Sequence, residues 1–144
     1  MKTIALLFLS LFMVKGCSQD EKKDLANADI VYTASSRGYY RKITIHNQEI
    51  TISKDRFEET PGVTSKISEA NWNELVGLLQ TVKLDSLSIY KVPTQRRFYD
   101  GAAIANMKVT YKEKEYQTSD FDHGTPPLEI EYFVKKLLLL AIHE

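Results

Sequence analysis

Two stretches of period-two alternation constrain the fold of this 144-residue chain more than any other feature. Residues 39–46 alternate between two sets of side chains, and residues 49–53 resume the pattern after the dipeptide Asn47-Gln48. Such alternation indicates half-buried strands, and a two-residue link between them predicts an antiparallel hairpin. Residues 103–111 alternate in the same way, and 116–119 return after a turn at 112–115. The sequence therefore predicts a second hairpin.

One segment between the hairpins has the spacing of an amphipathic helix. Ser68 is a predicted N-cap, because its hydroxyl can accept a hydrogen bond from a free backbone N–H of the first turn. Ile67 and Trp72 have the spacing of a hydrophobic staple, so we expect Trp72 in the core rather than in a ligand site. The apolar positions that continue this stripe are Leu75, Val76, Leu79 and Val82.

A second helix is predicted at the end of the chain, after a connector over residues 120–127. We expect Thr125 to cap this helix and Pro126 to occupy its first turn, where a missing N–H is tolerated. Leu139 and Leu140 widen its apolar face, so the helix is either covered on two sides or exposes a patch to a partner. The residues expected on its buried face are Ile130, Phe133, Val134, Leu137, Leu138 and Ala141.

With a short strand at residues 30–34, the predicted element order is β-β-β-α-β-β-α. Strands paired by hairpins, with helices between and after them, predict an α+β domain over residues 29–144. We expect an antiparallel sheet of about five strands with two helices packed on one face.

The N-terminus has the layout of an export signal. Lys2 precedes the apolar run Thr3–Val14, and Gly16 lies directly before Cys17, the only cysteine. The run is too short for a permanent membrane span, and the order is that of a signal peptide over residues 1–16. A disulfide would need a second cysteine, and a buried Cys17 does not suit its polar downstream neighbours.

Gly16-Cys17 resembles the bacterial lipobox, in which the cysteine is acylated and becomes the new N-terminus. Lys15 departs from this pattern, which leaves an ordinary signal peptide cut nearby as the alternative. The resemblance implies a lipidated tether over residues 17–28 and attachment to a membrane through Cys17. Residues 18–21 also resemble the acidic tag of surface-exposed lipoproteins, although any solvated tether would be charged in this way.

Charge argues against nucleic acid as a partner. The full chain has 19 basic and 19 acidic residues, and removal of Lys2 and Lys15 with the signal peptide leaves a net charge of −2. Nucleic-acid-binding domains carry a strongly basic face, which is missing here. No motif in the sequence predicts a cofactor.

Three connectors are rich in arginine, aromatic, aspartate and glycine residues. They are residues 36–39, 96–101 and 121–124. If they meet at one edge of the sheet, arginine would offer a fork for an anionic group and tyrosine or phenylalanine a stacking wall. The alternative is that Arg37 or Arg97 pairs with Asp100 or Asp122 and only pins the loops. The candidate binding residues are Arg37, Arg97, Tyr99, Asp100, Asp122 and His123.

The connector motifs also carry a family resemblance. Ser36-Arg37-Gly38, Pro93-Thr94, Arg97–Ala102 and Phe121–Pro127 resemble motifs of small uncharacterised lipoproteins from Bacteroidetes. The resemblance implies a compartment, the bacterial cell envelope, and a fold type. It implies no activity.

Three functional hypotheses follow. The first is a non-enzymatic, lipid-anchored interaction module of the cell envelope. We expect it at the outer membrane, either on the cell surface or on the inner side, with an envelope protein or a small anionic ligand as its partner. The second is an inhibitor or immunity-like protein that inserts residues 96–101 into an enzyme. The third is a small hydrolase or metal-dependent enzyme that uses Asp122 and His123; a metal site is disfavoured, because adjacent residues rarely converge on one ion.

The lipobox resemblance makes a direct prediction about the mature protein. Mass spectrometry of the chain purified from membranes should find Cys17 as the N-terminal residue, bearing fatty acids. Two or more acyl chains anchor firmly, because each buried methylene contributes about 0.8 kcal/mol. An intact Met1, or a mature terminus without fatty acid, would contradict the prediction.

Overall fold

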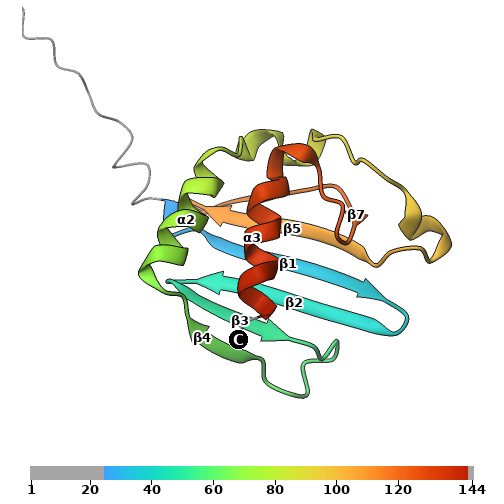
Figure 1. Ribbon diagram of the computed structural model, residues 1–144, viewed down its shortest axis with the longest axis horizontal. Helices are drawn as coiled ribbons and strands as arrows, with labels where there is room; N and C mark the ends of the chain where they lie inside the picture. Colours follow the sequence, from blue (N-terminus) through green and yellow to red (C-terminus); the bar gives the residue numbers. More distant parts are fainter. Residues whose placement is uncertain (1–24, 143–144) are drawn as a thin grey trace, which may run out of the picture.

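The computed structural model describes residues 25–142 and shows an antiparallel sheet with helices on one face, so the predicted α+β class is confirmed (Figure 1). The predicted signal peptide, Cys17 and most of the tether lie outside the described residues. Among residues 25–142, no helix is long and apolar enough to cross a bilayer.

The sheet is larger than the five strands predicted. Its order is β4-β3-β2-β1-β5-β6, every pairing is antiparallel, and β7 pairs with the start of β5. The strands are β1 (Asp29–Ser36), β2 (Tyr39–His46), β3 (Glu49–Ser53), β4 (Val63–Lys66), β5 (Ile104–Tyr111), β6 (Lys114–Gln117) and β7 (Phe121–Asp122).

Both predicted hairpins are confirmed, and both close through two residues with positive φ. Asn47 and Gln48 have φ of 48° and 64°, and Lys112 and Glu113 have φ of 49° and 64°. Turns of this hand match the twist of the flanking strands, although glycine is usual there. The second turn is shorter than the predicted residues 112–115, because Lys114 already pairs with Tyr111.

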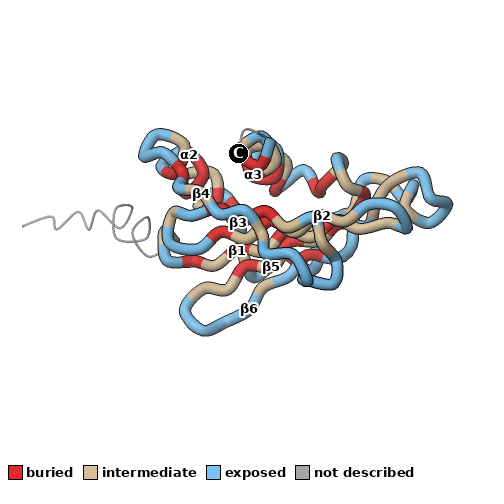
Figure 2. The backbone as a smooth tube through the Cα atoms, turned by 90° about the horizontal axis from the view of Figure 1, so that it is seen from below, coloured by how far each residue is buried: buried red, intermediate tan, exposed pale blue. Residues whose placement is uncertain are grey.

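Two α-helices, α2 (Glu69–Gln80) and α3 (Glu131–Ile142), lie side by side on the same face of the sheet (Figure 2). Ser68 caps α2 as predicted, since its Oγ accepts a hydrogen bond from the N–H of Asn71 at 3.3 Å. Trp72 is buried in the core, also as predicted. Three 3-10 helices complete the structure: η1 (Leu84–Ile89), η2 (Arg96–Tyr99) and η3 (Leu128–Ile130).

The core lies between the two helices and the sheet face that they cover. Alternate residues of β1, β2, β3 and β5 point into it, as the period-two pattern predicted. The largest side chains with almost no exposure are Tyr32, Phe121, Phe133, Ile43, Ile45, Ile50, Leu75, Leu79, Leu87, Met107, Ile130 and Leu137. The opposite sheet face carries mainly polar side chains, together with Val31, Tyr40 and Ile104, and is partly exposed.

The predicted start of the last helix is wrong. Thr125 does not cap it: η3 precedes α3, has Pro127 at its N-cap and receives no side-chain cap. The N–H of Thr125 instead donates to the carbonyl oxygen of Asp122 at 2.9 Å. Thr125 is therefore part of the turn that follows β7, and the helix begins only after the two prolines.

Candidate functional site

The three predicted connectors lie at one end of the sheet (Figure 1). They are the β1–β2 turn, the segment around η2, and β7 with the turn after it. Arg37 and Asp100, from the first two connectors, line a common hollow of about 320 Å³. The third connector contacts the second through Asp122. The three connectors, whose meeting the sequence left open, therefore do lie together in the structure.

The Asp122 carboxylate joins β7 to η2. Its side chain has no exposed surface, yet both oxygens accept hydrogen bonds from residues 94–97. The backbone N–H groups of Arg96 and Arg97 donate at 2.8 and 2.9 Å, the Thr94 hydroxyl donates to Oδ2, and Arg97 Nη1 donates at 3.2 Å. A buried charge is unfavourable unless it is paired and hydrogen-bonded, and this one is both.

These hydrogen bonds determine the charge state of Asp122. Burial by itself would raise the pKa of the carboxyl, but the hydrogen bonds from Thr94, Arg97 and Arg96 outweigh it and lower the pKa to about 2. Asp122 is therefore ionised across the physiological range, and its negative charge holds the start of η2 in place.

The sheet places Asp122 at this position. Phe121 pairs with Ala105 of β5 and is completely buried, so the next residue, Asp122, points to the other side of β7, opposite Ile104. The N–H of His123 donates to the carbonyl of Ala103 at 2.9 Å. Gly124 then takes a φ of 91°, which favours glycine, and reverses the chain.

The segment that Asp122 holds exposes two aromatic rings. Phe98 and Tyr99 are 72% and 71% exposed at the end of η2. The Arg97 guanidinium lies 4.4 Å from the centre of the Phe98 ring while it also contacts Asp122. Asp100 takes a left-handed conformation, and a Cβ on Gly101 would lie 2.9 Å from the Tyr99 ring. The exposed rings therefore stand on a defined backbone.

His123 belongs to an aromatic cluster rather than to the Asp122 contacts. Its Nδ1 lies 2.8 Å from the Tyr32 hydroxyl, and its ring is flanked by Tyr32 and Tyr39. Burial, and then the positive charge of Arg41, lower the pKa of His123. Burial likewise raises the pKa of Tyr32, so the hydroxyl beside Nδ1 keeps its proton.

The six predicted residues thus have different surroundings. Arg37 and Asp100 line the hollow, and Tyr99 is exposed beside it. Arg97 pairs with Asp122, which is the pinning contact that the sequence offered as an alternative. Sequence reasoning missed Thr94 and Phe98 as site residues. Both lie in motifs that carry the family resemblance, but no local pattern indicates that Thr94 contacts a residue 28 positions away.

Within residues 25–142, no three His, Cys, Asp or Glu side chains lie close enough together to hold a metal ion. Comparison of the chain with protein-family models and with curated proteins found no match.

The pKa of Asp122 predicts an acid-dependent loss of stability. The folded pKa of about 2 lies below the ordinary aspartate value of 3.8. The resulting stabilisation is therefore present above pH 4 and is lost as pH falls from 4 towards 2. Wild type should lose about 2 kcal/mol more unfolding free energy than Asp122→Asn between pH 5 and pH 2. Urea unfolding followed by circular dichroism measures the difference.

Asp120→Asn is the matched control. Asp120 is an exposed carboxylate two residues earlier, and its side chain accepts from Asn106 at 3.2 Å. This variant should keep the acid dependence of wild type. If Asp122→Asn also kept it, the assignment of the acid-labile stabilisation to Asp122 would be wrong.

Proposed function

We propose that this protein is a non-enzymatic, lipid-anchored interaction module of the bacterial cell envelope, and that it binds a partner protein through residues Arg96–Gly101, here called the η2 loop. One observation carries the proposal: two exposed aromatic rings stand on a loop that a buried carboxylate holds in place. The lipid anchor at Cys17 and the outer-membrane location rest on the sequence alone.

The residue types of the η2 loop support a protein partner. Tyrosine and arginine are enriched among the residues that dominate binding energy at interfaces, and aromatic rings bury a large area with few rotatable bonds. Phe98 and Tyr99 supply the rings, and Arg96, whose side chain is half exposed, supplies a charged group beside them. Three neighbouring residues of these types are suited to the centre of a small interface.

The order of the η2 loop also favours binding. A mobile loop loses conformational freedom when it binds, and this loss reduces affinity. Here the N–H groups of Arg96 and Arg97 are already held by Asp122, and the N–H of Gly101 donates to the carbonyl of Arg96 at 2.8 Å. Much of the ordering has therefore taken place before a partner arrives.

The direction of the chain supports an outward-facing site. The described chain enters β1 at Asp29, at the end of the sheet opposite the η2 loop (Figure 1). The eight residues of β1 span about 25 Å between the two ends. A tether that joins the domain at Asp29 would let the η2 loop point away from the membrane.

An inhibitor or immunity-like protein is the second candidate, because the η2 loop carries two exposed rings, Phe98 and Tyr99, that could enter the cleft of an enzyme. The hydrolase hypothesis gains no support from the contacts of its two residues. Asp122 uses both oxygens to hold the η2 loop, and His123 is hydrogen-bonded to Tyr32.

The proposal predicts that binding depends on Phe98 and Tyr99. Envelope extracts of the native host should contain a protein that binds immobilised wild type in a fixed ratio. The double variant Phe98→Ala/Tyr99→Ala should bind it about 30-fold or more weakly, because loss of a central anchor typically removes at least about 2 kcal/mol. Surface plasmon resonance with the purified partner measures the change.

Ile89→Ala/Tyr132→Ala is the matched control, since these side chains are 80% and 72% exposed and lie on η1 and α3 rather than on the η2 loop. It should bind as wild type does. An enzyme partner that loses activity in the complex would favour the inhibitor. Equal weakening by both double variants, or by neither, would contradict the proposed role of the η2 loop.

A further inference from the structure

A second hollow, of about 420 Å³, lies away from the η2 loop. The C-terminal end of α3 forms one wall, and β2, β3 and the β3–β4 loop form the others. Its volume is in the range of small-molecule sites, about 300–1,000 Å³. None of the six candidate residues from the sequence lines it.

One part of the hollow is aliphatic. Ile52 is buried at its base, while Val63 and Ile142 border it with 66% and 63% of their surfaces exposed. The two exposed side chains come from β4 and from the last residue of α3. A hydrocarbon group in the hollow would cover apolar surface that is now in contact with water.

The other part of the hollow carries two cations. Arg41 points from β2 towards the helix-covered side of the sheet, and Lys54 follows β3. Among the residues that the structure describes, neither side chain has an acceptor or an ion-pair partner, whereas Lys42 pairs with Glu58. Within residues 25–142, the two cations thus line the hollow without a paired carboxylate.

Among the residues that the structure describes, Asp55 is the carboxylate that lines the hollow, and it already accepts hydrogen bonds. Asp55 accepts hydrogen bonds from the N–H groups of Phe57 and Thr60 at 3.0 and 2.7 Å. These bonds, chiefly the one from Thr60, lower the pKa of Asp55. The carboxylate shapes the β3–β4 loop and makes no ion pair with Arg41 or Lys54 in the described residues.

We propose that this hollow binds a small aliphatic carboxylate, with the carboxylate at Arg41 and Lys54 and the hydrocarbon over Ile52, Val63 and Ile142. The guanidinium fork matches both oxygens of a carboxylate, and the ammonium adds a second charge. An inorganic anion would leave the aliphatic wall in water. A neutral hydrocarbon would bring no negative charge to Arg41 and Lys54.

The end of α3 competes for the same cations. A helix C-terminus carries a partial negative charge equivalent to about half an elementary charge, spread over its last carbonyl groups. A carboxylate carries a full charge on two oxygens that can face the guanidinium together. The carboxylate is therefore the stronger partner, and binding should not require α3 to move.

Octanoate is a suitable probe. Titration into the purified full-length protein, followed by amide and methyl NMR, should give saturable shifts at Ile52, Val63 and Ile142. Octan-1-ol and octylamine should bind at least about tenfold more weakly, because they keep the chain but lose the negative charge. Acetate, which has the charge without the chain, should also bind more weakly.

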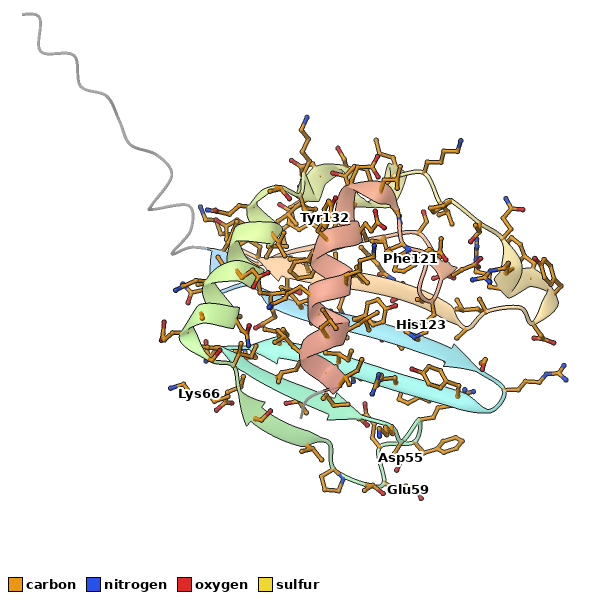
Figure 3. The ribbon with its side chains drawn as sticks, in the orientation of Figure 1. Asp55, Glu59, Lys66, Phe121, His123 and Tyr132 are labelled. Carbon is orange, nitrogen blue, oxygen red and sulfur yellow. The ribbon has the colours of Figure 1, made fainter. Side chains whose placement is uncertain are left out.

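Substitutions separate this site from a general affinity for amphiphiles. Arg41→Met should weaken octanoate binding about tenfold or more, and exposed Lys54→Met gives a second test should Arg41→Met fail to fold. Lys66→Met is the control, because Lys66 lies at the opposite end of the β3–β4 pair from Asp55 (Figure 3). It should bind octanoate as wild type does.

The proposal is overturned if octanoate gives no saturable shifts in the hollow, if octan-1-ol binds equally well, or if the folded Arg41 or Lys54 variant binds octanoate like wild type. The inference does not depend on the η2 loop. Phe98→Ala/Tyr99→Ala should retain octanoate binding even where it loses its protein partner.

Discussion

The buried carboxylate of Asp122 is the interaction on which the candidate site depends. A charge without solvent contact is stable only when donors surround it, and here the donors come from residues 94–97. The charge can therefore be buried only when residues 94–97 are ordered around it, so burial of Asp122 and ordering of the η2 loop depend on each other. Arg97 belongs to this support and also contacts the Phe98 ring, so the carboxylate positions the exposed aromatic surface through it.

The sheet and its helices position Asp122 because they hold β7 in place. Phe121 fills the core below α3, and its pairing with Ala105 sets the register that turns Asp122 towards η2. On the helix-covered side, His123 is held between Tyr32 and Tyr39. The chain enters the sheet at Asp29, at one end of the molecule, and the three connectors lie at the opposite end (Figure 1). The second hollow lies at the C-terminal end of α3.

The regular elements could be predicted because their signals are local. Period-two alternation identified the two hairpins, and Ser68 with Trp72 identified the start of the first helix. The strand β4 was missed because Val63–Lys66 has a single apolar residue and no alternation, and its place is set by pairing with β3. The site was predicted in part: the three connectors were recognised, but the contact of Asp122 with Thr94 joins residues far apart in sequence, and only the fold determines it.

The Asp122 carboxylate orders the η2 loop, and amide hydrogen exchange tests this ordering most directly. In wild type, the N–H groups of Arg96 and Arg97 donate to the buried carboxylate and should exchange slowly. In Asp122→Asn they should exchange at least about tenfold faster relative to core amides of β2, such as Ile43 and Ile45. Equal protection of Arg96 and Arg97 in the two proteins would show that the loop is ordered without the carboxylate and would contradict the account.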